Sequence, residues 1–241
     1  MRIQPRNLVL VALITVAFGV LVGLGTWQVQ RYSWKAGIVE DRHARTAAAP
    51  LDAAATAGTD AETLDYRRVT LTGEWDWSQA MVLANRARET TKGEELIVPL
   101  RLEDGRAVLV NRGWYPEGAR DAAITALQAR DDQGASGLIR DPGDLEGRQI
   151  PNGGWTRFSP VSMGATLPYG VVPWIVFEGT EVHGTPRPGS DLPLQGWQGF
   201  DNTTPHLQYA LTWYGLAAAL VVIAVVRLVV TPRRAARAAR P

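Results

Sequence analysis

Two long apolar runs lie near the two ends of the chain. Residues 8–27 carry no charge and include twelve Leu, Ile, Val or Phe residues. Residues 207–226 are also uncharged, and nine of them are Leu, Ile or Val. A helix rises about 1.5 Å per residue, so 20 residues span about 30 Å, the thickness of a bilayer's hydrocarbon core. The pattern therefore predicts two membrane-spanning helices, one near each end.

The first run is interpreted as a retained anchor and not as a signal peptide. A signal peptide has an apolar stretch of about 7–15 residues, followed by a small-x-small cleavage site. The run here is longer, and Gly23-Leu24-Gly25 matches that site poorly. Only seven residues precede the run, so a mitochondrial presequence is not expected either. Gly19 and Gly23 form a G-x-x-x-G motif, which permits close helix approach, and the two apolar helices are expected to be neighbours through it.

Between the two runs, short segments alternate apolar and polar residues, which is typical of half-buried strands. Asp104-Gly105 is a strong hairpin signal between two of them. Strands are expected at 66–73, 81–84, 96–102, 107–114, 137–140 and 173–178. A helix is expected at 117–130, a loop at 141–173, an extended Pro/Gly-rich segment at 183–205, and a loop or frayed helix at 41–64. The pattern predicts a β-rich α+β domain between two transmembrane α-helices.

Charge is distributed unevenly along the chain. All 24 acidic residues lie between Glu40 and Asp201, whereas five arginines and no acid follow Val226. Basic residues favour the cytoplasmic side of membrane helices, so both termini are expected in the cytoplasm. A basic tail beside an apolar helix does not indicate nucleic-acid binding. The expected order is a cytoplasmic tail (1–7), a first transmembrane helix (8–30), an extracytoplasmic β-rich domain (31–205), a second transmembrane helix (206–227) and a basic cytoplasmic tail (228–241).

The composition limits which metal sites and catalytic sites the chain can form. The chain has no cysteine, which excludes disulfides and thiolate metal sites, and only three methionines, which argues against a Met-rich copper site. Its three histidines, His43, His183 and His206, are too far apart in sequence to form a metal-ligand motif. The sequence contains no nucleophile elbow, zinc-protease motif, phosphate-binding loop or dinucleotide fingerprint. The protein is therefore not expected to be an enzyme, and a membrane-anchored hydrolase is the weakest interpretation.

The start of the second apolar run holds the candidate binding residues. His206, Tyr209 and Trp213 stand at i, i+3 and i+7, on one helical face. They are either interfacial residues whose polar ends reach water, or a ligand site with His206 as the metal ligand. Just after the first run, Trp27 and Arg31 stand at i and i+4. They form either an aromatic and basic anchor at the membrane surface or a cationic site for a carboxylate.

A further polar segment lies in the central domain, at Asn111-Arg112-Gly113-Trp114. One interpretation is a strand end whose arginine pairs with an acid. The other is part of a surface that faces a partner protein. Paired acids at 94–95, 103–104 and 131–132 border expected turns and are interpreted as solvated charge.

Four segments of the chain, taken in order, resemble the Surfeit locus protein 1 family. The first is G-x-W-Q-x-x-R-x-x-x-K, from Gly25 to Lys35, directly after the first apolar run. The second is Y-R-R-V-x-L-x-G, starting at Tyr66, and the third is V-L-V-N-R-G-W-Y-P, starting at Val108. The fourth is H-L-Q-Y-A-L-T-W-Y-G-L-A, starting at His206. Each segment alone is modestly specific, but four in order with an apolar run at each end are highly specific.

The resemblance implies a cytochrome c oxidase assembly factor, a chaperone of the respiratory chain in the plasma membrane of a bacterium. Some bacterial members of the family bind haem a. The expected partners are the catalytic subunit of the oxidase and membrane lipid, with haem a synthase as a further candidate.

With that resemblance, the expected roles can be assigned residue by residue. His206 would ligate the haem iron, and Tyr209 and Trp213 would pack against the macrocycle. Trp27 would lie at the same site, and Arg31, or Lys35 beside it, would pair with the propionates. The alternative is a membrane scaffold for oxidase subunits that never binds haem.

Overall fold

The structure, a computed structural model, describes residues 5–88, 90–130, 132–151, 153–182, 191–200 and 204–238. Two residues considered above, His183 and Asp131, lie outside these described residues. The chain divides into a helical unit, formed by Met1–Asp41 and Asp201–Pro241, and a β unit, Arg42–Phe200.

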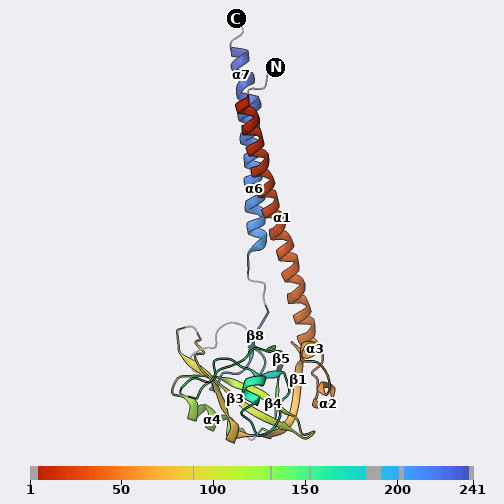
Figure 1. The fold of residues 1–241 in the computed structure, drawn as a ribbon, viewed down its shortest axis with the longest axis vertical. Helices are drawn as coiled ribbons and strands as arrows, with labels where there is room; N and C mark the ends of the chain where they lie inside the picture. The colour runs from red at the N-terminus through yellow and green to blue at the C-terminus, as the bar shows by residue number, and fades with distance from the viewer. Residues whose placement is uncertain are drawn as a thin grey trace. The chain divides into compact units, whose positions relative to one another are not determined.

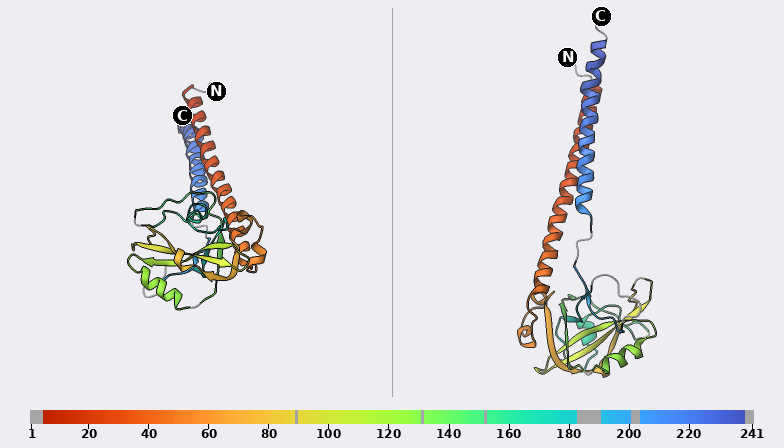
Figure 2. Two further views of the ribbon diagram at one scale, coloured as in Figure 1. Left: turned by 60° about the horizontal axis from the view of Figure 1, so that its bottom comes forward. Right: turned by 180° about the vertical axis from the view of Figure 1, so that it is seen from behind.

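The helical unit consists of two long helices that run antiparallel, side by side (Figures 1 and 2). Helix α1 extends over Pro5–Ala47, its last residues lying in the β unit, and α6 extends over His206–Val225. A π-helical turn, η2 at Val226–Val230, joins α6 to the basic helix α7, Thr231–Ala238. Both long helices are apolar and long enough to cross a membrane. The two predicted spans are thus two helices in the structure.

The two helices approach each other at Gly25 of α1. A Cβ atom at this position would lie 2.7 Å from the Tyr214 ring of α6, so only glycine leaves room for that ring. The neighbouring Thr26 hydroxyl lies 3.1 Å from the Tyr214 hydroxyl, within hydrogen-bond distance. On α6, Ala210 and Ala217 are both buried, as expected for small residues at a helix interface. The contact fixes which face of each helix meets the other.

The predicted role of Gly19 and Gly23 in this contact is wrong. A Cβ atom at either position would have no atom within 4 Å outside its own helix. The motif therefore does not face α6, because the helices meet on the side of α1 that carries Gly25. Glycine is common in membrane helices for reasons other than packing, so the motif alone was a weak signal.

The β unit is built on one sheet that closes on itself. Its strands are β1 (Arg68–Trp75), β2 (Met81–Leu83), β3 (Gly93–Leu102), β4 (Ala107–Pro116), β5 (Gly134–Arg140) and β6 (Ile175–Glu178). They lie in the order β1-β5-β6-β4-β3-β2, and β1 also pairs with β3. The pairing of β1 with β3 closes β1, β5, β6, β4 and β3 into a five-stranded barrel, and β2 pairs with β3 outside this ring. All pairs are antiparallel except β4 with β6.

Closure depends on Gly73, where β1 leaves β5 and pairs with β3 instead. The register sets Gly73 opposite Leu102 and Trp75 opposite Leu100. A Cβ atom on Gly73 would collide with the carbonyl oxygen of Arg101 on β3. A side chain at this position would therefore push apart the two strands that close the barrel.

Alternate residues of all five barrel strands form the main core. Val69 and Leu71 of β1 are each 1% exposed. The other barrel strands also contribute buried residues to the same cluster. The other buried members of this cluster are Leu64, Leu100, Leu102, Val108, Val110, Ala135, Ile139, Trp174 and Val176. Period-two burial of this kind is what the alternating sequence pattern predicts.

Two further clusters cover the barrel. Helix α4, Arg120–Gln128, packs Ala123 and Leu127 against residues of β2, β3 and β4. Helix α5, Pro160–Gly164, is capped by the Ser159 hydroxyl and contributes Met163 to a cluster with Trp155 and Phe158. The remaining short elements are α2 (Ala53–Thr56), α3 (Ala61–Leu64), η1 (Trp77–Gln79), β7 (Glu181–Val182) and β8 (Trp197–Gln198).

The predicted fold class is confirmed, as two long apolar helices flank a β-rich unit. All six expected strands are present, and the expected hairpin joins β3 to β4. The expected helix at 117–130 is α4 with shorter bounds. Two loop predictions were incomplete. The first helix continues to Ala47, and 141–173 contains α5.

Candidate functional site

The candidate ligand His206 is the first residue of α6 and lies against α1. Its side chain is buried, with 8% of the residue exposed. Its Nδ1 atom lies 2.8 Å from the side-chain oxygen Oε1 of Gln28 on α1. A carboxamide oxygen can only accept a hydrogen bond, so in this contact Nδ1 carries the hydrogen and donates it. The neutral ring then has a bare lone pair on Nε2.

That second ring nitrogen is buried and has no hydrogen-bond partner among the described residues. A buried polar atom without a partner costs roughly 1–3 kcal/mol, so such atoms are rare and call for an explanation. An imidazole nitrogen with a free lone pair is able to ligate a metal ion. The sequence alone could not show this, because it depends on which nitrogen faces Gln28.

The other residues assigned to the site lie on the same two helices but make different contacts. Trp27 and Tyr209 are 54% and 53% exposed, so their rings are free for another molecule, and Trp213 is half-buried. The Arg31 guanidinium lies 4.2 Å from the ring centre of Trp34 on its own helix. Among the described residues, no hydrogen bond or ring contact joins these side chains to His206.

Lys35 is already engaged near the start of α6. Its Nζ atom donates to the hydroxyl oxygen of Thr204 at 2.9 Å, and the carbonyl oxygen of Thr204 accepts from the His206 amide at 2.8 Å. The lysine thus ties α1 to the residues that lead into α6. Arg31, which is exposed and has no acidic partner within the described chain, is the freer cation for a carboxylate.

The β unit contains a second polar cluster, centred on Arg112 of β4. This side chain is completely buried, and its Nε atom lies 2.8 Å from Oε2 of Glu178. Its Nη2 atom donates to both carboxylate oxygens of Asp132, at 3.0 and 3.2 Å. The guanidinium stacks 3.8 Å from the ring centre of Trp75. The interpretation of Arg112 as a strand arginine paired with acids is confirmed.

Burial changes the acidity of Glu178. Removing its carboxylate from water raises the pKa to about 7, although nearby Arg112 acts in the opposite direction. The same carboxylate accepts a hydrogen bond of 2.6 Å from Gln195, which in turn accepts one of 2.9 Å from Arg130. Glu178 therefore links β6 to the segment 191–200, which precedes α6 in the chain.

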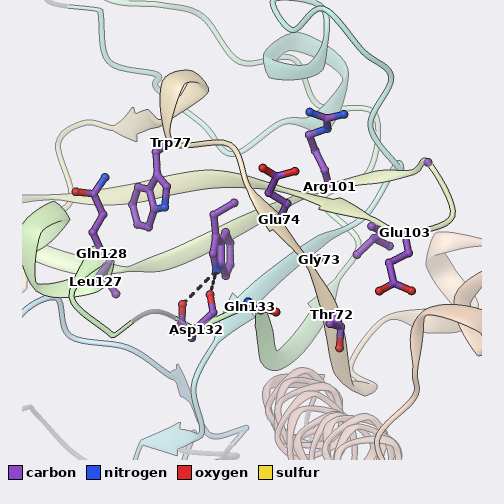
Figure 3. A pocket seen from close by; sticks show the side chains of 13 residues that line it. Thr72, Gly73, Glu74, Trp77, Arg101, Glu103, Leu127, Gln128, Asp132 and Gln133 are labelled. Carbon is purple, nitrogen blue, oxygen red and sulfur yellow. Dashed lines mark hydrogen bonds between the residues drawn. The ribbon is translucent and has the colours of Figure 1, made fainter.

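Beside this cluster the β unit has an open cleft of about 720 Å³, shown in Figure 3. The indole N–H of Trp75 donates to the backbone and side-chain oxygens of Asp132, at 2.9 and 3.1 Å. The lining residues are Thr72, Gly73, Glu74, Trp75, Trp77, Arg101, Leu102, Glu103, Gly105, Leu127, Gln128, Asp132 and Gln133. Two indoles beside exposed carboxylates and amides form a surface suited to a polar protein segment.

Within the described part of the chain, no group of three or more His, Cys, Asp or Glu side chains gathers as metal ligands. His206 stands as a single donor. One imidazole is enough to bind the axial position of a haem iron, because the porphyrin supplies the other nitrogens. The residues present fit that group better than a bare metal ion.

The fold and the candidate site together define a two-helix protein of membrane type with a β-barrel unit and one buried candidate ligand. Two antiparallel helices able to cross a membrane carry a buried histidine with one bare ring nitrogen, and along the chain they precede and follow a closed five-stranded barrel. A family model described as the SURF1 family matches residues 15–218. The chain belongs to the SURF1 family.

Relatives from animals and bacteria match most of the chain. Surfeit locus protein 1 of Homo sapiens is 30% identical over 219 residues, covering 82% of this chain and 70% of the human protein. The protein of the same name from Mus musculus is 28% identical over 216 residues, covering 82% and 68%. A SURF1-like protein of Rickettsia felis is 27% identical over 226 residues, covering 90% and 95%.

Proposed function

We propose that this protein is an assembly factor for a haem–copper oxidase, and that it holds haem a for the catalytic subunit. Membership of the SURF1 family supports the assembly role. The match to a bacterial relative along nearly its whole length supports a place in the bacterial plasma membrane. The function is holding and delivery, without a catalytic step.

The observation that carries the haem proposal is the bare Nε2 atom of His206. It is buried and unpartnered, whereas Nδ1 of the same ring is held by Gln28. A haem supplies an iron with an axial position for one imidazole nitrogen, a large apolar ring and two carboxylates. His206, the first residue of α6, provides the nitrogen, and its contact with Gln28 of α1 holds the ring.

The surrounding residues match the other parts of the group. Tyr209, Trp213 and Trp27 offer aromatic surface for the apolar ring, and two of the three are more than half exposed. Arg31 offers a cation for a propionate at the end of the membrane helix. An exposed ion pair of this kind contributes only about 0–1 kcal/mol, so Arg31 assists binding without determining it.

The charge distribution sets the orientation that this function needs. Both basic ends favour the cytoplasm, which supports an orientation with the β unit outside and His206 near the outer surface of the membrane. Haem a then passes within the bilayer from its synthase to the catalytic subunit of the oxidase. In this orientation the exposed apolar faces of α1 and α6, which are long enough to cross a membrane, would face lipid.

The visible spectrum of the protein tests the proposal. The wild-type protein, purified in detergent from cells that make haem a, should carry haem, and His206→Ala should lose most of it. His43→Ala is the matched control, because His43 lies in the β unit and its ring contacts the carbonyl of Phe200. Arg31→Ala should weaken retention by no more than about fivefold, the equivalent of about 1 kcal/mol. Membrane levels of each variant establish that the protein is still inserted.

A scaffold without haem is the second candidate, and the cleft beside Trp75 and Trp77 supports it. A cleft of about 720 Å³ with indole walls is large enough to receive side chains of a partner subunit. Equal haem content in His206→Ala and wild type, at equal membrane levels, would leave the scaffold function and remove the ligand role.

A further inference from the structure

We infer that Gln28 is a positioning residue for His206, holding the imidazole in the tautomer whose Nε2 can ligate a metal. This inference rests on the proposed function of His206 as a haem ligand. Its evidence is the 2.8 Å contact between Nδ1 of His206 and Oε1 of Gln28, together with the unpartnered Nε2 on the other side of the ring.

The tautomer decides whether the ring can act as a ligand. A neutral imidazole has one N–H and one bare nitrogen, and only the bare nitrogen binds a metal. Histidines that bind metals donate their other N–H to a carbonyl or carboxylate, which fixes the tautomer and the ring orientation. The carboxamide oxygen of Gln28 has that relation to His206 before any metal is bound.

The helix pairing keeps the Gln28 side chain in register with the ring. On one side of it along α1, Gly25 receives the Tyr214 ring, and on the other Lys35 binds Thr204. Gly25, Gln28 and Lys35 stand at i, i+3 and i+10, on one helical face. Two contacts therefore bracket the hydrogen bond and fix the rotation of α1 about its axis.

The opposite orientation of the carboxamide would leave the ring unable to act as a ligand. If the amide nitrogen of Gln28 donated to Nδ1, the ring hydrogen would move to Nε2. Nε2 would then be a buried N–H group that could not bind an iron, although it is without a protein partner among the described residues in either orientation. In the orientation of the structure, Nε2 is a lone pair that an incoming iron can satisfy.

The first test needs no haem. The full-length protein is labelled with nitrogen-15 histidine, reconstituted in detergent micelles and studied by NMR at alkaline pH, with His206 assigned from the signal lost in His206→Asn. We expect a protonated Nδ1 and a bare Nε2 in the wild type. In Gln28→Leu, a large share should shift to the form with a protonated Nε2. A wild-type His206 with a protonated Nε2 would overturn the inference whatever the protein does with haem.

The second test measures the haem-loaded protein. Gln28→Leu should weaken haem retention on the order of 10–100-fold, the usual cost of losing the partner of a ligating histidine. Gln28→Glu keeps an acceptor oxygen at the same place and should restore retention. Because a carboxylate makes the imidazole a stronger donor, Gln28→Glu should also lower the midpoint potential of the bound haem. Gln30→Leu, on the exposed side of the same helix, is the matched control and should match the wild type.

The outcomes separate this inference from the proposed function. A wild type that binds haem, with Gln28→Leu equal to it in retention and potential, refutes the role of Gln28 and leaves His206 as the ligand. A wild type without haem, but with the bare Nε2 tautomer, refutes the proposed function and leaves the hydrogen bond intact. If Gln28→Leu does not insert, the wild-type tautomer and the potential of Gln28→Glu decide.

Discussion

Glu178 makes the stability of the β unit depend on pH in a direction opposite to that of an ordinary surface carboxylate. Burial raises its pKa from the usual 4.5 to about 7, in spite of the adjacent Arg112. Asp132 adds repulsion, since both acids share the one guanidinium. A carboxyl group with a raised pKa binds its proton more tightly in the folded state than in the unfolded state. Its contribution is therefore complete below about pH 4.5 and is lost as the pH rises through about 7.

The size of the effect follows from the shift. Each unit of pKa difference between the folded and unfolded states corresponds to about 1.4 kcal/mol, so Glu178 should change the free energy of unfolding by up to about 3 kcal/mol. The group is 8% exposed, and water therefore screens it little. We expect the wild type to gain most of this amount relative to Glu178→Gln as the pH falls from about 8 to about 5.

The assay is urea unfolding of the full-length protein in detergent, followed by near-ultraviolet circular dichroism at several pH values. The relevant quantity is the difference between wild type and Glu178→Gln, because all other titrating groups cancel in it. Glu103→Gln, an exposed residue of the same unit, is the control and should show no such slope. A difference that stays constant between pH 5 and 8, or that shrinks as the pH falls, would refute the reasoning.

Three further predictions concern the buried cation, the helix contact and the topology. Arg112→Met should cost about 3–5 kcal/mol in the same unfolding assay, because it leaves two acids without their buried partner; a cost below about 1 kcal/mol would contradict the ion-pair account. Gly25→Val should reduce cysteine crosslinking between α1 and α6, because its Cβ would meet the Tyr214 ring, and adding Tyr214→Ala should restore it; undiminished crosslinking in the single variant would place the contact elsewhere. A reporter active only in the cytoplasm should work when fused after Arg240 and fail when inserted near Gly58, and the reverse pattern would invert the orientation.

Local patterns predicted the elements of the β unit because their causes are local. Val69 and Leu71 alternate with threonines, and both enter the core. Asp104-Gly105 forms the turn between β3 and β4, with Gly105 at a positive φ of 85° that a hairpin turn favours in glycine. Each signal lies within a few residues of the structure that it specifies.

The closure of the barrel could not be predicted in the same way. It depends on β1 changing partners at Gly73, from β5 to β3, about 30 residues further along the chain. A glycine inside a strand pattern indicates a bend or a close approach, but it does not name the strand that approaches. The partners of Arg112 were hidden for the same reason, since Asp132 and Glu178 come from different segments.

The candidate site shows where sequence reasoning ends for a pair of membrane helices. Helical spacing placed His206, Tyr209 and Trp213 on one face, and the motif that contains Gln28 was recognised separately on the other helix. Neither segment indicates how one helix is rotated against the other. Both are apolar around most of their circumference, and because lipid is as apolar as leucine, burial does not favour one face over another. That rotation is set by the glycine that admits a tyrosine ring, and with it the histidine meets a carboxamide. The candidate histidine could be named from the sequence, whereas the ring nitrogen that is left bare could be inferred only from the packing of the pair.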